Sequence, residues 1–296
     1  MLTGLSSDPK ICIVTGANRG LGLATGLGLA AQGATVLMLC RDRARGEAAR
    51  DEVASRSGQS EVKLFIGDLA SQASIRNVAT RILESHPRVD VLVNSAAVYA
   101  SKRRVTADGL ELMFAVNHAG PFLLTNLLLD GLRRSDQARI VNVTAPSTVQ
   151  VDFEDLQGEA RFSSLNAFGA TKTANLLFTF ELARRLEGTA VTATAVHPGL
   201  LRSDLMRESP GLMRFVIGLF SKPAEQAAQG LVRLAVAPEF RGETGKFYRD
   251  GREIQAFDYA YDPEPGGKLW DLTARLTGLS QWDGLPQDTD RPSPRP

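Results

Sequence analysis

The chain has 296 residues, 43% of them hydrophobic, which suits one large α/β domain or two small ones. Its 34 Lys and Arg residues nearly balance 33 Asp and Glu residues, so the net charge favours neither nucleic acid nor an anionic membrane as a partner. No apolar stretch reaches the roughly 18 residues that predict a membrane-spanning helix. Two cysteines, Cys12 and Cys40, lie in apolar runs, which predicts buried thiols and a reducing, cytoplasmic compartment.

Short runs rich in β-branched residues alternate with helix-length segments along most of the chain. The runs lie at residues 11–14, 34–39, 62–66, 89–93, 139–143, 191–196 and 246–248. The longest helical stretches, 117–134 and 165–187, each fall between two predicted strands and are expected to be crossover helices. This alternation predicts an α/β fold with a single Rossmann-type, doubly wound parallel sheet of about seven strands and helices on both faces.

The domain plan is one unit with short extensions. Residues 1–9 are expected to be a leader, 10–283 the Rossmann domain, and the Pro- and Asp-rich residues 284–296 a disordered tail. Between about 200 and 222 the pattern breaks into short amphipathic pieces, which we interpret as a substrate lid. Its apolar part suits an apolar small molecule, although the same pattern is typical of a dimer-contact or membrane-surface helix.

A glycine-rich turn follows the first predicted strand directly. Residues 15–22 read Thr-Gly-Ala-Asn-Arg-Gly-Leu-Gly, and a helical pattern begins at their end. Glycines at such a turn let backbone N–H groups approach a pyrophosphate at the positive end of the helix. Taken alone, the pattern also describes an ordinary strand-to-helix turn. Its place inside a strand–helix–strand unit favours a dinucleotide site.

The end of the second predicted strand bears on which dinucleotide binds. An NAD-specific site carries an acidic residue there, to bond the ribose hydroxyls, whereas this chain has Arg41. With Arg19 of the glycine-rich turn, Arg41 could hold a 2′-phosphate between two guanidinium groups, although it could also be a solvated Arg at a helix start. NADP(H) is therefore the favoured cofactor, and Asp42, one residue later, leaves NAD(H) as the alternative.

Four further motifs follow in order, namely Gly-Asp-Leu at 67–69, Asn-Ser-Ala-Ala at 94–97, Asn117, and His-Pro-Gly at 197–199. With them, residues 10–250 resemble the short-chain dehydrogenase/reductase family, and segments 116–125, 172–178 and 269–279 look like its retinol dehydrogenase-like branch. By this resemblance the cofactor-binding residues are Gly16, Asn18, Arg19, Gly20, Leu21, Gly22, Arg41, Asp68, Leu69, Asn94, Ala96, Lys172, Pro198, Gly199 and Leu200.

The resemblance also assigns parts of the cofactor to these residues. Asp68 would hold the adenine, residues 94–96 would line the adenosine side, and residues 198–200 would contact the nicotinamide carboxamide. Simpler roles exist for two of them, because Asp68 could cap a helix and Asn94 could satisfy a strand end. The family often pairs its two long helices between subunits, which implies a homodimer or homotetramer.

The catalytic positions depart from the family pattern. The family uses a Tyr to exchange the proton, a Ser to orient the substrate oxygen, a Lys four residues after the Tyr to lower its pKa, and an Asn to complete the relay. The matching residues here are Phe168, Ala145, Lys172 and Asn117. Acid catalysis typically contributes about 10²–10⁴ in rate and one oxyanion donor about 10²–10³, so ordinary carbonyl reduction should be nearly abolished.

Replacement hydroxyls are scarce near these positions. Strand alternation predicts that Thr144 points to the opposite face from position 145. Ser147, Tyr99 and His118 are nearer in the order of motifs, but such residues are more often structural.

Three explanations stay open. In the first, the chain is an NADP(H)-dependent oxidoreductase for a carbonyl or alcohol of an apolar small molecule, and its two catalytic hydroxyls were lost by drift or removed by design. In the second, it is a cyclase, isomerase or lyase that keeps the cofactor as a scaffold. In the third, it is a non-catalytic NADP(H)-binding protein. Fold alone does not select among them.

Overall fold

The computed structural model describes residues 9–59, 61–200, 205 and 221–279. The expected tail at 284–296, the leader apart from Pro9, and most of the expected lid at 200–222 lie outside the described residues. The domain boundaries proposed from the sequence therefore stay predictions.

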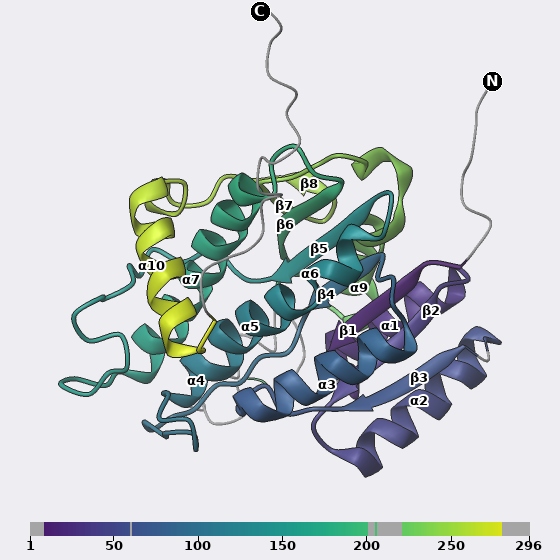
Figure 1. The fold of residues 1–296 in the computed structure, drawn as a ribbon, viewed down its shortest axis with the longest axis horizontal. Coiled ribbons are helices and arrows are strands. Elements are labelled where there is room, and N and C mark those ends of the chain that lie inside the picture. The colour runs from purple at the N-terminus through teal and green to yellow at the C-terminus, as the bar shows by residue number, and fades with distance from the viewer. Residues whose placement is uncertain (1–8, 60, 201–204, 206–220, 280–296) are drawn as a thin grey trace, which may run out of the picture.

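One eight-stranded sheet organises the described chain, in the order β3-β2-β1-β4-β5-β6-β7-β8 (Figure 1). The strands are β1 (Ile11–Thr15), β2 (Thr35–Cys40), β3 (Val62–Ile66), β4 (Val91–Asn94), β5 (Ala138–Val143), β6 (Val191–His197), β7 (Lys246–Arg249) and β8 (Arg252–Glu253). Neighbours from β3 to β7 pair in parallel, and β8 pairs antiparallel with β7. The predicted doubly wound sheet is confirmed. The two residues of β8 were too few to give a sequence pattern.

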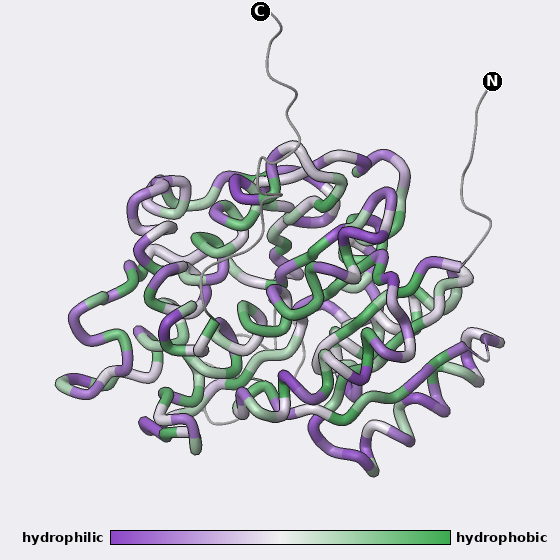
Figure 2. The backbone as a smooth tube through the Cα atoms, in the orientation of Figure 1, coloured by the Kyte–Doolittle hydropathy of each residue, from purple (hydrophilic) through white to green (hydrophobic). Residues whose placement is uncertain are grey.

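Helices cover both faces of the sheet. They are α1 (Gly20–Ala31), α2 (Arg43–Ser57), α3 (Gln72–Ser85), α4 (Leu112–Phe114), α5 (Gly120–Leu127), α6 (Leu129–Arg133), α7 (Ser164–Arg185), α9 (Ala224–Val236) and α10 (Pro263–Leu276), with a π-helical turn η1 (Ala115–Ala119) and 3₁₀ turns η3 (Pro238–Phe240) and η4 (Asp258–Ala260). One apolar core joins the sheet to α1, α2 and α9, and the other joins it to α3, α5, α6 and α7. Figure 2 shows hydrophobic strands inside and hydrophilic residues along the outer side of α2. No helix within the described ranges is long and apolar enough to cross a bilayer.

The long helix predicted over 117–134 is not continuous. It is divided into the turn η1, α5 and α6, with Leu128 between the last two. Asn117 lies in the π-helical turn, and its side chain bonds the backbone of Val98, at 2.8 Å from Oδ1 to the Val98 N and 3.0 Å from Nδ2 to the Val98 O. Sequence periodicity does not reveal such a local tertiary constraint. The second long helix, predicted over 165–187, is confirmed as α7.

The last helix, α10, packs across α5 and α7. The Trp270 ring lies edge-on to Phe122, with centroids 4.8 Å apart, and its centroid is 5.9 Å from that of Phe178. On the same surface, His118 Nε2 and Thr273 Oγ1 are 3.0 Å apart. Part of the outer surface of α5 and α7 is therefore covered by α10.

Candidate functional site

A cavity of about 590 Å³ opens at the carboxyl ends of the strands, where the strand order reverses between β1 and β4. Crevices at such a reversal are the usual ligand sites of open α/β sheets. Its lining includes Gly16, Asn18, Arg19, Gly20, Leu21, Gly22, Arg41, Asp68, Leu69, Ala96, Ala145, Phe168, Lys172, Pro198, Gly199 and Leu200. The fold thus brings together residues that are up to 189 positions apart along the chain, from Gly16 to Leu205.

The glycine-rich turn is shaped for close backbone approach. Gly16 has a φ of +66°, in the left-handed region that favours glycine. A Cβ on Gly22 would lie against the Gly16 carbonyl, 2.8 Å from its carbon, so position 22 has no room for a side chain. Among the described residues, no side chain caps the first turn of α1, which leaves its N–H groups for another acceptor. The turn and the helix end therefore fit the pyrophosphate of a nicotinamide dinucleotide.

The loop after β4 is tied to the end of β1. Thr15 Oγ1 accepts hydrogen bonds from the backbone N of Ser95 at 2.9 Å and of Ala96 at 3.0 Å. This contact places Ala96 in the cavity wall. Asn94 is different, because its buried side chain donates to Thr125 Oγ1 and Asn142 Oδ1 and does not line the cavity. Its Oδ1 is buried and has no hydrogen-bond partner among the described residues, so the amide is only partly satisfied, and the expectation that Asn94 lines the adenosine side stays a prediction.

Three arginines surround the region beyond β2. Arg19, Arg41 and Arg45 all line the cavity. Asp42 lines it too, but its Oδ1 accepts a hydrogen bond from Arg45 N at 3.0 Å and so caps α2. Arg45 was missed from the sequence, although its place four residues after Arg41 puts it in the first turn of α2. The cationic end of the cavity thus suits a phosphate better than two ribose hydroxyls.

Asp68 lines the cavity beside Leu69 without capping a helix. Its Oδ1 accepts from Ala70 N at 2.9 Å, whereas Ser71 caps α3 by accepting from Ser74 N. The simpler explanation of Asp68 as a helix cap therefore does not hold.

The catalytic positions lie at the other end of the same cavity. Ala145, Phe168 and Lys172 line it together. Lys172 is 7% exposed, and its Nζ lies 4.7 Å from the centroid of the Phe168 ring. Burial lowers the pKa of Lys172 to about 8. The Lys172 side chain, with a pKa near neutral pH, is therefore held beside positions 145 and 168, whose side chains carry no hydroxyl.

Asn117 supports this arrangement from behind the cavity. It is 1% exposed, and its Nδ2 donates to Thr171 Oγ1 at 3.2 Å as well as to Val98. Thr171 belongs to α7, so Asn117 connects the loop after β4 to the helix that carries Lys172. Within this structure Asn117 is a positioning residue.

Thr144, which strand alternation placed on the opposite face from position 145, directs its hydroxyl towards α7. Thr144 Oγ1 donates to the backbone O of Lys172 at 2.9 Å, and Thr144 lines the cavity. Strand alternation continues to this residue, because Asn142, two residues earlier, also faces α7 and donates to Thr179 Oγ1. The Thr144 hydroxyl is therefore already engaged with the α7 backbone.

The three substitute residues considered from the sequence do not line the cavity. Tyr99 OH donates to Ser164 Oγ at 2.9 Å, and its ring lies edge-on to Phe168. Ser147 Oγ accepts from Val149 N. His118 is packed under α10, where burial lowers its pKa to about 4.

His197 was missed as a lining residue, although it immediately precedes the Pro-Gly pair at the end of β6. Its Nδ1 is buried and has no hydrogen-bond partner among the described residues. Burial, reinforced by the charge of Arg249, lowers the pKa of His197. The ring is therefore neutral near pH 7.

Comparison with known proteins gives consistent matches. The family model for short chain dehydrogenase matches residues 10–211. Mouse retinol dehydrogenase 12 is 39% identical, over 95% of this chain and 90% of that protein. Human retinol dehydrogenase 13 is also 39% identical, over 97% of this chain and 88% of that protein.

Solved structures match over a similar span. A crystal structure of an uncharacterized protein from Mycobacterium paratuberculosis has a TM-score of 0.73 and 31% identity, and the match covers 92% of this chain and 96% of that one. A blue fluorescent protein from a metagenomic library, crystallised in complex with NADPH, has a TM-score of 0.64 and 25% identity, covering 81% of this chain and 95% of that one.

Proposed function

We propose that this chain, which belongs to the short-chain dehydrogenase family, is an NADP(H)-dependent oxidoreductase with a degenerate active site. Its proposed substrate is an apolar alcohol or carbonyl compound. The family uses NAD(P)(H), and the chain's relatives include retinol dehydrogenases. The observation that carries the proposal is the cavity itself. The glycine-rich turn, Arg41, Asp68 and Lys172 line it, while positions 145 and 168 carry no hydroxyl.

The preference for NADP(H) rests on charge. Arg41 and Arg45 face the cavity from the end of β2 and the start of α2, and Arg19 does so from the glycine-rich turn. Guanidinium groups match the geometry of a phosphate and bind it through paired, charge-assisted hydrogen bonds. Because Asp42 caps α2, it is less available for the ribose hydroxyls that an NAD-specific site would bind.

The chemistry divides between cofactor and chain. When bound, the nicotinamide would supply or accept a hydride. Lys172 would bind the cofactor's ribose and keep a positive charge near the reacting oxygen, and Asn117 would hold the position of α7. Neither Phe168 nor Ala145 can donate a proton or a hydrogen bond from its side chain. Turnover by the chain as it stands is therefore expected to be very low.

The substrate is proposed to be apolar and of retinoid type. Val98, Val116, Leu200 and Leu205 provide apolar walls of the cavity, and Val98 and Leu205 pack in the same cluster as Phe168. The relatives that are similar over most of the chain are, by name, retinol dehydrogenases. The buried free thiols of Cys12 and Cys40 support a reducing compartment, and we propose the cytoplasm.

A non-redox reaction is the second candidate. Among the described residues that line the cavity, side-chain hydroxyls belong to Ser95 and Thr144, and the Thr144 hydroxyl is bonded to α7. A reaction that needs no acid at position 168, such as an isomerisation with the cofactor as scaffold, would be compatible with this wall. A non-catalytic cofactor-binding protein would be compatible as well.

The test compares the chain with the double variant Ala145→Ser, Phe168→Tyr. Loss of NADPH absorbance is followed with all-trans-retinaldehyde and a saturated long-chain aldehyde as substrates. The proposal expects reduction by the double variant and little by the starting chain, with both proteins binding NADPH equally. If the double variant binds NADPH but stays inert towards carbonyl compounds generally, the oxidoreductase proposal is wrong and the non-redox candidate replaces it.

A further inference from the structure

A second cavity, of about 370 Å³, lies on the other side of α7 from the dinucleotide cavity. Ala167, Ala170 and Ala174 line it, whereas Phe168 and Lys172 of the same helix line the dinucleotide cavity. The remaining wall comes from the connection between β5 and α7 and from the start of α4, through Glu111 and Phe114. Its volume is in the range of small-molecule sites, which run from about 300 to 1,000 Å³.

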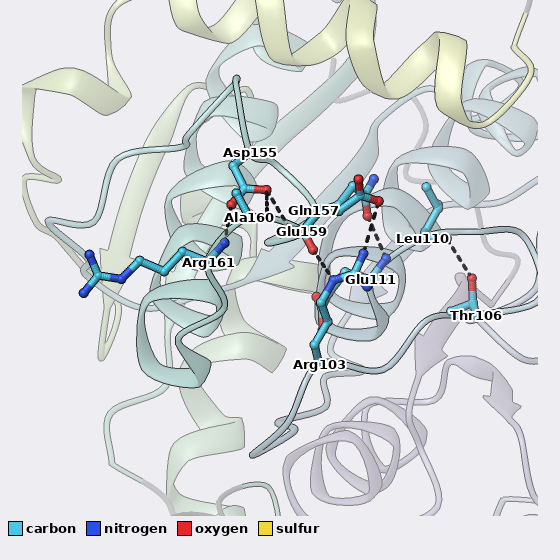
Figure 3. Close-up of polar contacts among 9 residues, drawn as sticks. All are labelled: Arg103, Thr106, Leu110, Glu111, Asp155, Gln157, Glu159, Ala160 and Arg161. Carbon is cyan, nitrogen blue, oxygen red and sulfur yellow. Dashed lines mark hydrogen bonds and ion pairs between the residues drawn. The ribbon is translucent and has the colours of Figure 1, made fainter.

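The wall formed by the β5–α7 connection is held by hydrogen bonds (Figure 3). The Asp155 carboxylate accepts from the backbone N of Glu159 at 2.6 Å, of Ala160 at 3.2 Å and of Arg161 at 3.0 Å. These backbone bonds, with Arg161 first, lower the pKa of Asp155, so it stays negatively charged. The cavity is therefore bounded by a folded loop with a fixed carboxylate.

The same loop is fastened to the start of α4. Arg103 Nε donates to the Gln157 backbone O at 2.9 Å, and Gln157 Oε1 accepts from Glu111 N at 2.7 Å (Figure 3). These contacts join the loop to Glu111, more than 40 residues earlier in the chain. Glu111 is thereby fixed at the base of the cavity wall.

One of the two carboxylate oxygens of Glu111 is buried without a hydrogen-bond donor among the described residues. The residue is 2% exposed, and its Oε2 accepts from Phe114 N at 2.8 Å. Its Oε1 is buried and has no hydrogen-bond partner within the described parts of the chain. Buried polar atoms are nearly always paired, so an unpaired carboxylate oxygen in a cavity wall indicates a missing donor. Burial raises the pKa of Glu111, and it outweighs the opposing effects of the backbone N–H groups of residues 112–114 and of the Arg103 charge.

The charge around the cavity indicates which donor fits. Asp152 and Asp155 line it together with Glu111, and Arg161 is the cation among its described lining residues. Figure 3 shows the Arg161 side chain extending away from Asp155 and Glu111. The polar part of the cavity is therefore acidic.

Its apolar part is formed by larger side chains. Phe114, Val151, Leu156 and Phe162 line it, with the alanines of α7 opposite. A ligand that fits both parts combines a positively charged N–H donor with a short apolar body.

We propose that this cavity binds a small organic ammonium ion with an apolar body, with the ammonium group on Glu111. This site is separate from the dinucleotide cavity, so the inference goes beyond the proposed function and does not depend on it.

Isothermal titration of the full chain with n-hexylammonium at pH 7 tests the inference, with n-hexanol and hexanoate as probes of the same length. We expect saturable binding of the ammonium compound, at least tenfold weaker binding of the alcohol, and none of the carboxylate. Equal affinity for all three probes, or no binding of n-hexylammonium, would overturn the inference.

Three variants locate the binding. Glu111→Gln keeps an oxygen to accept from Phe114 N and should weaken n-hexylammonium at least tenfold. Glu154→Gln removes the same charge from an exposed position on the same loop that does not line the cavity, and should change affinity less than twofold. Ala170→Leu fills the cavity from α7 and should prevent binding. An unchanged affinity in Glu111→Gln or Ala170→Leu, or an equal loss in Glu154→Gln, contradicts the assignment.

Discussion

The Lys172 ammonium lies over the face of the Phe168 ring, with Nζ 4.7 Å from the ring centroid. The two residues are four apart on α7, a spacing that places side chains one turn apart on the same side of a helix. A Tyr at position 168 would carry its hydroxyl on this ring, close to the cation. In the chain as it stands, the ring can offer the ammonium a cation–π contact but no hydrogen bond.

A first prediction is that the buried Lys172 lowers the free energy of unfolding of the chain at pH 7. Burial lowers its pKa to about 8 in the folded chain, against about 10.4 when unfolded, which corresponds to roughly 3 kcal/mol at 1.36 kcal/mol per pKa unit. The contact with Phe168 offsets about 0.5–2 kcal/mol. Lys172→Met, which keeps an apolar chain of similar length, should therefore raise stability at pH 7 by about 1–3 kcal/mol.

The cost of burying Lys172 is expected to depend on pH. Below pH 8 the ammonium is charged in both states, so the full cost is present. Between pH 8 and about 10.4 the unfolded chain binds more protons than the folded one, so stability rises with pH. The advantage of Lys172→Met should then shrink, which urea unfolding at pH 7 and pH 10.5 will measure. A variant less stable than the starting chain at pH 7 would indicate that the charge is stabilised in the folded state.

A second prediction concerns the glycine-rich turn. Gly22→Ala would press a methyl group against the Gly16 carbonyl, so the turn must shift and dinucleotide affinity should fall at least tenfold, about 1.4 kcal/mol. Gly26→Ala is the matched control on α1, because its Cβ would meet Val36 Cγ1 at an ordinary 3.7 Å. It should leave affinity unchanged and stabilise the helix by up to about 1 kcal/mol. Fluorescence titration with NADPH measures both variants, and an equal effect on the two affinities would contradict the steric argument.

Local patterns predicted the sheet and the cofactor side of the cavity because they act through contiguous residues. The glycine-rich turn, Arg41 and Asp68 each follow directly from a strand end, and parallel strands bring those ends together. Arg45 could have been found in the same way, one helical turn after Arg41. The sequence-based assignment of these residues to parts of the cofactor stays a prediction.

Contacts between distant segments could not be read from the pattern. Asn94 is withdrawn from the cavity by Thr125 and Asn142, which lie 31 and 48 residues further along. Asn117 bonds the backbone of Val98, 19 residues earlier, and the Thr144 hydroxyl bonds the backbone O of Lys172, 28 residues later. Each of these outcomes is set by packing that a single sequence does not display.

A third prediction tests the phosphate-binding arginines. NADPH should bind at least tenfold more tightly than NADH, a difference of about 1.4 kcal/mol. Arg41→Ala should reduce that ratio, since it removes a guanidinium from the cavity end, whereas Arg43→Ala at the start of α2, which does not line the cavity, should preserve it. Titration of both dinucleotides against all three proteins measures the ratios. Equal affinities in the starting chain would exclude the phosphate-clamp hypothesis.

The final prediction separates the two missing hydroxyls. Phe168→Tyr alone restores the acid, and Ala145→Ser alone restores the donor to the substrate oxygen, but the reaction needs both in the same transition state. Each single variant should therefore recover far less NADPH-dependent reduction than the double variant, because residues that act as a unit are not additive. Acid catalysis contributes about 10²–10⁴ and one oxyanion donor about 10²–10³, so the double variant should exceed the starting chain by several orders of magnitude.

The pH profile of the double variant adds a check that turnover alone does not give. The Lys172 ammonium beside Tyr at 168 should lower the pKa of the phenol below its ordinary value of about 10. Reduction needs the protonated phenol, so the rate should be flat at low pH and fall as pH rises through that lowered pKa. Lys172→Met added to the double variant should move the fall to higher pH, measured as kcat against pH at saturating NADPH. A fall that does not move would mean that Lys172 does not set the acidity of the restored tyrosine, even if both hydroxyls are needed for turnover.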